Sequence, residues 1–244
     1  MRVVLASNNA KKLAELRSLF AGLPIELVTQ GSLGVPEAEE PHRTFLENGL
    51  AKARHAAAAT GLPALADDSG LCVDALGGAP GVDSAVYAPM PSTQGDREVL
   101  RRAQDAANNA LLLERLAPQA DRRAAFVSTL VALRHAGDPE PLVACGRWAG
   151  EILLAPRGQG GFGYDPLVYV PALGCSVAEL DAATKNRVSH RALAAAQMRQ
   201  RLAEAWDLGL DPAPAPARRR APGRTAAAGA VRASAVVPAQ VSLL

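Results

Sequence analysis

The chain has 244 residues, 49% of them hydrophobic and 20% charged, with a formal net charge of +2 at pH 7. This length and composition predict a soluble globular protein with a full hydrophobic core, and no apolar run approaches the roughly 18 residues that span a membrane. From Asp207 onward five arginines accompany two aspartates, so the rest of the chain is close to −1, which argues against binding polymeric nucleic acid through counterion release.

The first half of the chain predicts strands and helices in alternation. The N-terminal MRVVLASNN is too short an apolar stretch for a signal peptide and predicts a strand over residues 2–6. Leucines at helical spacing follow, and IELV predicts a second strand over residues 25–28. A capping-box pattern, T-x-x-E from Thr44, opens a helix over residues 45–60. Next, ALA predicts a strand over residues 64–66 that ends at two aspartates.

The second half predicts, in order, a helix over 96–116, strands over 123–134, 141–153 and 167–170, and a helix over 191–206. The turn-rich HAGDPEP between the two longer strands predicts an antiparallel hairpin, and Ser189 suits the N-cap of the last helix. Strand–helix units combined with a long hairpin predict an α/β fold, with a mixed central sheet flanked by helices.

Composition also predicts the domain boundary and the compartment. Residues 1–207 are expected to form a single domain, whereas residues 208–244 are rich in Ala, Pro, Gly and Arg and predict a disordered tail. Cys72, Cys145 and Cys175 are too widely spaced for a disulfide framework or a C-x-x-C metal pair. A reducing, cytoplasmic location is therefore expected.

The first candidate functional loop, ASNNAKKL, joins a strand to a helix. Backbone N–H groups at a helix N-terminus favour an anion, and Lys11 and Lys12 add positive charge to the same turn. The P-loop pattern G-x-x-x-x-G-K-[ST] is absent from the sequence. A capped helix start with surface lysines is the alternative interpretation.

The second loop, ADDSG, brings Asp67 and Asp68 together. Two carboxylates supply oxygen ligands for Mg²⁺, and one of them can also orient or deprotonate a water. An acidic cluster, Glu37, Glu39 and Glu40, precedes the helix and provides a further ligand. The alternative is an Asx-type turn that closes the strand, with both acids solvated.

The third loop, RGQGGFGYDP, matches G-x-G-x-x-G literally but does not fit a dinucleotide fingerprint. That fingerprint opens a helix, whereas Tyr164-Asp165-Pro166 blocks one and a strand-like segment follows. Phe162 or Tyr164 is available to stack on a nucleobase. Equally, the aromatic side chains of a glycine-rich hairpin loop can belong to the core.

The fourth loop, TKNRVSHRALA, places Lys185 four residues before Ser189, on one face of a helix. His190 and Arg191 then lie in the first turn of the last helix. Arginine is unfavourable there unless an anion or polar ligand compensates it, although a surface arginine on a capped helix is the simpler alternative. Together the four loops offer acids for a metal, lysines for phosphates and an aromatic ring for a base, which suits a nucleoside triphosphate with Mg²⁺.

Five stretches occur in an order that resembles a known family: LASNNAKKLAEL, EEPHRTFLENGLAKA, ALADDSGLCVDALGGAPGVDSAVYA, GGFGYDPLVYVP and TKNRVSHRALA. Over about residues 2–205 the chain is similar to the noncanonical purine nucleoside triphosphate pyrophosphatases, the inosine/xanthosine triphosphatases. The resemblance implies an elongated single α/β domain of that fold, and a homodimer. It also implies Mg²⁺-dependent hydrolysis of ITP, dITP and XTP to the monophosphate and pyrophosphate.

The same resemblance implies roles for particular residues. Asp68 would be the general base and a metal ligand, with Asp67 beside it and Glu40 or Glu39 completing the metal site. The substrate would contact Ser7, Asn8, Asn9, Ala10, Lys11, Lys12, Ser69, Phe162, Gly163, Tyr164, Asp165, Lys185, His190 and Arg191. Two alternatives stay open: a Maf-like pyrophosphatase acting on modified pyrimidine nucleotides, and a nucleotide-binding module without enzymatic activity.

Overall fold

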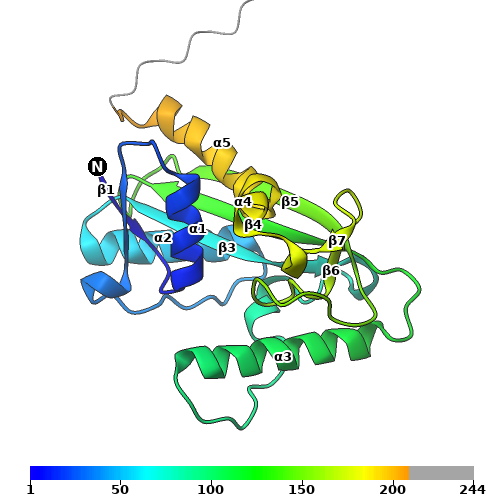
Figure 1. The fold of residues 1–244 in the computed structure, drawn as a ribbon. Coiled ribbons are helices and arrows are strands. Elements are labelled where there is room, and N and C mark those ends of the chain that lie inside the picture. The colour runs from blue at the N-terminus through cyan, green and yellow to red at the C-terminus, as the bar shows by residue number, and fades with distance from the viewer. Residues whose placement is uncertain (209–244) are drawn as a thin grey trace, which may run out of the picture. The chain divides into compact units, whose positions relative to one another are not determined.

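A computed structural model describes residues 1–208, and the predicted tail lies outside the described residues from residue 209 onward. The seven strands form one mixed sheet in the order β2-β1-β3-β4-β5-β6-β7 (Figure 1). They are β1 (Arg2–Leu5), β2 (Glu26–Thr29), β3 (Ala64–Val73), β4 (Arg123–Leu133), β5 (Leu142–Ile152), β6 (Val168–Val170) and β7 (Cys175–Ser176). Strand β1 pairs in parallel with β2 and β3, and the other pairs are antiparallel, so the predicted α/β fold with a mixed sheet is confirmed.

The α-helices are α1 (Ala10–Leu19), α2 (Phe45–Thr60), α3 (Arg97–Leu116), α4 (Ala182–Val188) and α5 (His190–Ala205). Short 3-10 turns occur at η1 (Gly31–Leu33), η2 (Asp74–Leu76), η3 (Gly81–Ala85) and η4 (Val177–Glu179). Thr44 caps α2 through the Glu47 N–H, but Glu47 accepts from the Thr44 hydroxyl rather than from its backbone, so the capping box is half formed. Ser189 caps α5 as predicted.

Two layers of helix cover opposite faces of the sheet. Helices α1 and α5 pack over a core that includes Leu65, and the alanines of α2 pack over a second core that includes Ala64 and Ala66. The alternation along β3 produces this division, because successive side chains of a strand point to opposite faces. A third core, which includes Leu112 and Leu116 of α3, lies toward the other end of the sheet.

Strand β3 is longer than predicted. It does not end at the two aspartates but continues to Val73, pairing with β4 from Ala64 through Val73. The interpretation of ADDSG as a turn that closes the strand is therefore wrong. On its other edge β3 pairs with β1 only as far as Leu65, so the edge beyond that residue is left to loops and to the start of α1.

One glycine of the hairpin allows α5 to lie directly on the sheet. A Cβ added to Gly146 of β5 would overlap the carbonyl oxygen of His190 and lie 2.7 Å from the nitrogen of Ala194. The missing side chain lets the first turn of α5 cross the strand at backbone contact. That close approach delivers His190 and Arg191 to the open edge of β3.

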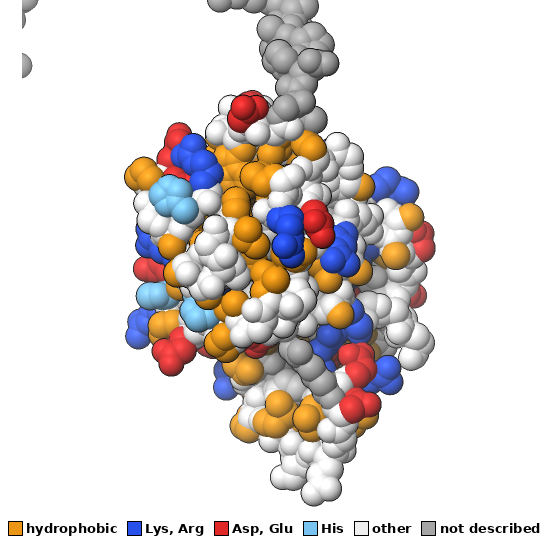
Figure 2. All heavy atoms as spheres, turned by 90° about the vertical axis from the view of Figure 1, so that its left-hand side faces the viewer, with side chains coloured by type: hydrophobic (Ala, Val, Ile, Leu, Met, Phe, Trp, Pro, Cys, Tyr) orange, Lys and Arg blue, Asp and Glu red, His pale blue; other side chains and the backbone are white. Residues whose placement is uncertain are grey.

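The surface is of mixed charge. On the face shown in Figure 2, the lysine and arginine side chains of the described residues are interspersed with aspartate and glutamate side chains. Among residues 1–208, no helix combines the length and apolar character that crossing a bilayer requires.

Candidate active site

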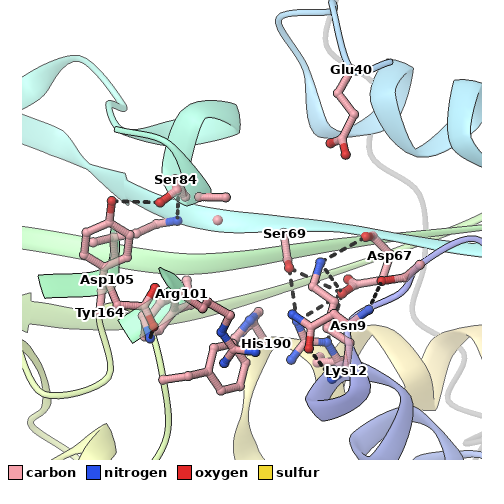
Figure 3. Close-up of a pocket in the computed structure, with 18 of the residues that line it drawn as sticks. Asn9, Lys12, Glu40, Asp67, Ser69, Ser84, Arg101, Asp105, Tyr164 and His190 are labelled. Carbon is pink, nitrogen blue, oxygen red and sulfur yellow. Dashed lines mark hydrogen bonds and ion pairs between the residues drawn. The ribbon is translucent and has the colours of Figure 1, made fainter. Parts of the chain in front are cut away.

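A cavity of about 370 Å³ lies at the open edge of β3 and brings the four predicted loops together. Figure 3 shows Asn9, Lys12 and Asp67 at one end of it and Ser84, Asp105 and Tyr164 at the other, with Arg101 and His190 between them. The predicted residues that line it are Ser7, Asn9, Lys12, Glu40, Asp67, Ser69, Phe162, Gly163, Tyr164, Asp165, Lys185, His190 and Arg191. Four others do not line this cavity, namely Asn8, Ala10, Lys11 and Glu39, and neither does Asp68.

The start of α1 differs from the expectation of free N–H groups. Asn9 is the N-cap, and its Oδ1 accepts from the backbone N–H groups of Lys11 and Lys12 at 3.0 and 3.1 Å. These N–H groups are already bonded to Asn9. The positive charge that this loop presents to the cavity therefore comes from the Lys12 ammonium and not from free N–H groups. Lys11 instead points toward α3, where its Nζ lies 3.3 Å from Glu98.

Asp67 is a fully buried carboxylate surrounded by donors. It accepts from Ser128 Oγ at 2.7 Å and from Arg191 Nε at 3.0 Å, and Lys12 Nζ lies 3.2 Å away. Burial alone would raise the pKa of Asp67, but the charges of Arg191 and Lys12 outweigh it and hold the pKa far below the usual range. Asp67 is therefore ionised at any physiological pH.

Asp68 has a different environment. Its Oδ1 accepts from Lys52 Nζ at 2.7 Å, and the same ammonium donates to Glu40 Oε2 at 2.9 Å. The other oxygen, Asp68 Oδ2, is buried without a hydrogen-bond partner. Burial raises the pKa of Asp68 above its usual value even though Lys52 opposes the shift. For Lys52 burial acts in the opposite direction and would lower the pKa, but the charges of Asp68 and Glu40 outweigh it, so the pKa of Lys52 is raised.

The two aspartates point to opposite faces of β3. Asp67 lies on the face of β3 that carries Leu65, toward α1 and α5, while Asp68 lies on the face of Ala64 and Ala66, toward α2. Asp67 pairs with Arg191 and Lys12, and Asp68 pairs with Lys52, so the predicted pair of carboxylates does not converge on one point in this structure. The carboxylates that converge are Asp68 and Glu40, both on Lys52, and Glu39 is exposed away from the cavity.

The fourth loop forms an ion-pair network with α1. Arg191 pairs with Asp67 and Glu15 and donates to Ser69 Oγ at 3.0 Å. Lys185 Nζ donates to Asp165 Oδ2 at 2.7 Å and lies 3.7 Å from Glu15. The anions that compensate Arg191 at the start of its helix are thus the protein's own, and the interpretation of a surface arginine is wrong because Arg191 is 2% exposed.

His190 is held in an aromatic stack rather than an ion pair. Its ring lies 5.0 Å from Phe126 and 6.5 Å from Trp148, nearly parallel to both. Burial, reinforced by the charge of Arg191, holds the pKa of His190 well below its usual value, so the imidazole is neutral. Its Nδ1 is buried and has no hydrogen-bond partner within the described residues, which leaves a polar atom for a ligand.

The aromatic residues of the glycine loop divide between core and cavity. Tyr164 is buried in the third core, and its hydroxyl donates to the Ser84 carbonyl at 2.9 Å. Burial raises the pKa of this phenol well above its usual value. Phe162 lines the cavity, with Lys185 Nζ 4.6 Å and the Arg101 guanidinium 5.3 Å from the ring centroid. Of the two, Phe162 has the position for stacking.

The residues of the site that were missed from the sequence include Lys52, Glu15 and Ser128. Lys52 lies on the face of α2 that also buries Asn48, Ala53 and Ala56, and a lysine in that stripe was a usable signal. Glu15 and Ser128 had no local signal, because their partners lie far away in the chain.

The fold and the cavity define a class of protein. A cavity of the size that holds a small organic ligand lies at an edge of a mixed α/β sheet, and it is lined by five carboxylates and five cations, namely Glu37, Glu40, Asp67, Asp105 and Asp165, and Lys12, Lys52, Arg101, Lys185 and Arg191. A cavity that is lined by many paired charges, with nearby buried polar atoms that lack a hydrogen-bond partner, is typical of enzymes and binding proteins for small, multiply charged ligands.

Known proteins then identify the family. A model of the Ham1 family matches residues 3–201. A dITP/XTP pyrophosphatase of Methylibium petroleiphilum is 71% identical over 206 residues, 84% of this chain and 99% of the relative. One from Burkholderia pseudomallei is 61% identical over 203 residues, 83% of this chain and 94% of that one. The chain belongs to the Ham1 family, and the resemblance noted from its sequence is confirmed.

Solved structures agree with this assignment. A HAM1 protein from Coxiella burnetii has a TM-score of 0.76 at 45% identity, covering 84% of this chain and all of the other. The Ham1 protein of Staphylococcus aureus has a TM-score of 0.71 at 35% identity, covering 84% of this chain and 99% of the other.

Proposed function

We propose that this chain hydrolyses noncanonical purine nucleoside triphosphates, ITP, dITP and XTP, to the nucleoside monophosphate and pyrophosphate. Family relatives carry the name dITP/XTP pyrophosphatase, and the cavity has the charges that a triphosphate requires. The observation that carries the proposal is Asp68, a buried carboxylate whose Oδ2 has no partner and which lies next to the cavity lysine Lys52. Hydrolysis would remove deaminated purines from the nucleotide pool.

Asp68 is proposed as the general base. A raised pKa brings a carboxylate closer to the range in which it accepts a proton effectively at neutral pH. Oδ2 would take a proton from a water, whose oxygen forms a bond to the α-phosphorus while the bond from the α-phosphorus to the bridging oxygen breaks. Pyrophosphate then leaves with the electron pair of that bond. The charge of Lys52 opposes the rise in the pKa of Asp68 and so favours the ionised form that can accept a proton.

Asp68 and Glu40 are the residues that would hold Mg²⁺. No group of three or more His, Cys, Asp or Glu side chains within residues 1–208 is arranged to bind a metal by itself. Magnesium, however, is commonly held by one or two carboxylates together with substrate phosphates and waters, so these two residues and the unpaired Oδ2 fit it. When bound, the ion would neutralise charge on the phosphate oxygens.

Lys12 is proposed to bind the leaving pyrophosphate. Asp67 already has Arg191 as a buried partner, so the half-buried Lys12 ammonium can turn toward a phosphate without leaving Asp67 uncompensated. Stabilising the charge that develops on pyrophosphate lowers the barrier to bond breaking. Ser7, Asn9 and Ser69 line the same end of the cavity.

Arg191 and His190 are proposed to select a 6-oxo purine. Arg191 has more N–H donors than its contacts with Asp67, Glu15 and Ser69 use, and His190 Nδ1 is unsatisfied. A donor that faces O6 of hypoxanthine or xanthine would face the amino group of adenine instead. An unpaired buried polar group costs about 1–3 kcal/mol, which disfavours ATP.

A homodimer in the cytoplasm is part of the same proposal. Val86, Met90 and Leu154 are large apolar side chains exposed at 66%, 60% and 80%, which an assembly of two chains would cover. Three free cysteines are compatible with a reducing compartment. Sedimentation equilibrium tests the dimer, and a monomer at micromolar concentration would contradict it.

The deciding experiment is pyrophosphate release from ITP with Mg²⁺, compared with ATP, a pyrimidine triphosphate, and the same reaction in EDTA. We expect rapid release from ITP, slow release from ATP, and loss of release in EDTA. Preference for the pyrimidine nucleotide would favour the Maf-like alternative. Binding of ITP without turnover would favour the nucleotide-binding module.

A further inference from the structure

Helix α3 carries three polar residues at a spacing of four, Arg101, Asp105 and Asn109. Residues four apart on a helix lie on one face, so these side chains form a stripe over two turns. All three are directed at the glycine loop that bears Phe162 and Gly163. None of them is needed to cap α3, which has Asp96 as its N-cap.

The stripe holds both backbone polar groups of a single residue. The Gly163 N–H donates to Asp105 Oδ2 at 2.9 Å, and Asn109 Nδ2 donates to the Gly163 carbonyl at 3.0 Å. Gly163 has a φ of +62°, a left-handed conformation that glycine adopts without strain. Two side chains one turn apart therefore fix the position and orientation of this residue relative to α3.

The residue before it carries the ring that faces the cavity. Arg101 places its guanidinium 5.3 Å from the Phe162 ring centroid, and its Nη2 is buried without a partner. The Phe162 N–H donates to Asp165 Oδ2 at 2.9 Å, which anchors the other side of the loop. With Gly163 held by Asp105 and Asn109 and the Phe162 N–H held by Asp165, the backbone that carries the ring is fixed on both sides.

We propose that Arg101, Asp105 and Asn109 are positioning residues that hold Phe162 as the platform on which the purine ring of the substrate stacks. This inference rests on the proposed function and adds to it the elements that support the base. Asp105 lies at the end of the cavity away from Lys12 and Asp67, and Arg101 lies between the two ends (Figure 3). They should therefore govern affinity for the base and leave binding of the phosphates alone.

Two near-isosteric substitutions separate positioning from general structure. Asn109→Asp removes the donor to the Gly163 carbonyl and places an acceptor against it, whereas Asp105→Asn keeps an oxygen for the Gly163 N–H. We expect Asn109→Asp and Asp105→Leu to raise KM for ITP about tenfold, as for the loss of a buried hydrogen bond, with kcat changed less than about threefold. Asp105→Asn should raise KM less than Asp105→Leu. Glu114→Gln, at an exposed position of the same helix, is the control.

Inhibition by inorganic tripolyphosphate distinguishes a positioning role from a general structural defect, because a structural defect would weaken its binding as well. It has the phosphates without the base, so its inhibition constant against ITP hydrolysis should be the same in all variants. An unchanged KM for ITP in both Asn109→Asp and Asp105→Leu, or equal weakening of ITP and tripolyphosphate, overturns the inference. If the wild type binds ITP without hydrolysing it, the proposed function fails. Dissociation constants from quenching of tryptophan fluorescence then decide the positioning roles in the same way.

Discussion

Asp67 and Asp68 are neighbours in sequence with opposite electrostatic situations. Asp67 is surrounded by Arg191, Lys12 and Ser128, which keep it charged, whereas Asp68 has one cation and an unsatisfied oxygen. A carboxylate whose oxygens are paired with cations and stay ionised is suited to a structural role. A buried carboxylate with a raised pKa is suited to proton transfer. The surroundings of each side chain thus distinguish a structural carboxylate, Asp67, from the proposed general base, Asp68.

Asp68→Asn should lower kcat for ITP by at least about a thousandfold, because an amide of the same shape cannot accept the proton of the attacking water. The thermal unfolding midpoint should stay close to that of the wild type. Asp83→Asn, at an exposed position, serves as the control for a charge change. A variant that keeps a tenth of the wild-type turnover would contradict the role of Asp68.

Glu40→Gln and Glu39→Gln form a matched pair at adjacent positions. Glu40 lines the cavity and shares Lys52 with Asp68, whereas Glu39 is exposed outside it. We expect Glu40→Gln to raise the Mg²⁺ concentration for half-maximal activity by about tenfold, since one charged ligand is lost. Glu39→Gln should leave it unchanged. Equal effects of the two changes would argue against the assignment.

Asp67→Asn should destabilise the protein in a pH-dependent way. The pKa of Asp67 is depressed in the folded chain, so its contribution is fully present above the unfolded value of about 3.9 and declines as the pH falls toward the folded value. Breaking such a buried pair costs about 3–5 kcal/mol at neutral pH. Urea unfolding at pH 7 and pH 3 measures this. A difference between variant and wild type that did not shrink at pH 3 would contradict it.

At the scale of elements, the position of the first turn of α5 depends on the absence of a side chain at Gly146 of β5. The backbone of α5 meets Gly146 without an intervening side chain, and Arg191 and His190 enter the cavity from that turn. A helix moved outward by one methyl group would carry both residues with it. Packing in the hairpin is therefore coupled to the geometry of the site.

Gly146→Ala should both destabilise the fold and impair activity. The new Cβ overlaps backbone atoms, which cannot move as a side-chain end can, and overpacking of this kind costs about 1–3 kcal/mol or more. Gly137→Ala in the turn of the same hairpin is the control, because its nearest neighbour would be 3.9 Å from the added atom. Chemical unfolding and ITP turnover of both variants measure the effect, and equal stability of the two would contradict it.

Most elements could be predicted from local patterns. The hairpin, the helix capped by Thr44 and the last helix capped by Ser189 follow from spacing and caps that act within a few residues. The extent of β3 could not be predicted, because acidic residues in mid-strand are tolerated only when distant cations compensate them. Lys52 and Arg191 supply that compensation from helices separate in sequence.

At the scale of the whole molecule, the sequence predicted which loops meet but not how their charges pair. Phosphate-end residues such as Lys12 and base-end residues such as Phe162 line one cavity, as the loops predicted. The stripe on α3 and the bridging Glu15 escaped prediction, because nothing near them in sequence marks their partners. Long-range ion pairs are properties of the folded chain rather than of a motif.

A chain truncated after Leu208 should hydrolyse ITP within about twofold of the full-length rate, because it keeps all the described residues that pack in the core. Trp206 is buried in the first core, and Leu208 packs against it. Truncation after Ala205 removes Trp206 and should cost about 3–5 kcal/mol of unfolding free energy. Turnover and thermal melts of both truncations test the boundary, and inactivity of the longer one would contradict it.

The alternation of Asp67 and Asp68 also protects the alignment of the sheet. A slip of β3 by one residue against β4 would turn each acid to the opposite face. In either direction only one acid would take the place of the other beside Arg191 or Lys52, and the second would lie two residues along the strand from the nearer of these cations. Misaligned strands would therefore be destabilised by unpaired charge as well as by misplaced hydrophobic side chains. The residues proposed for chemistry thus also help to select the correct strand register during folding.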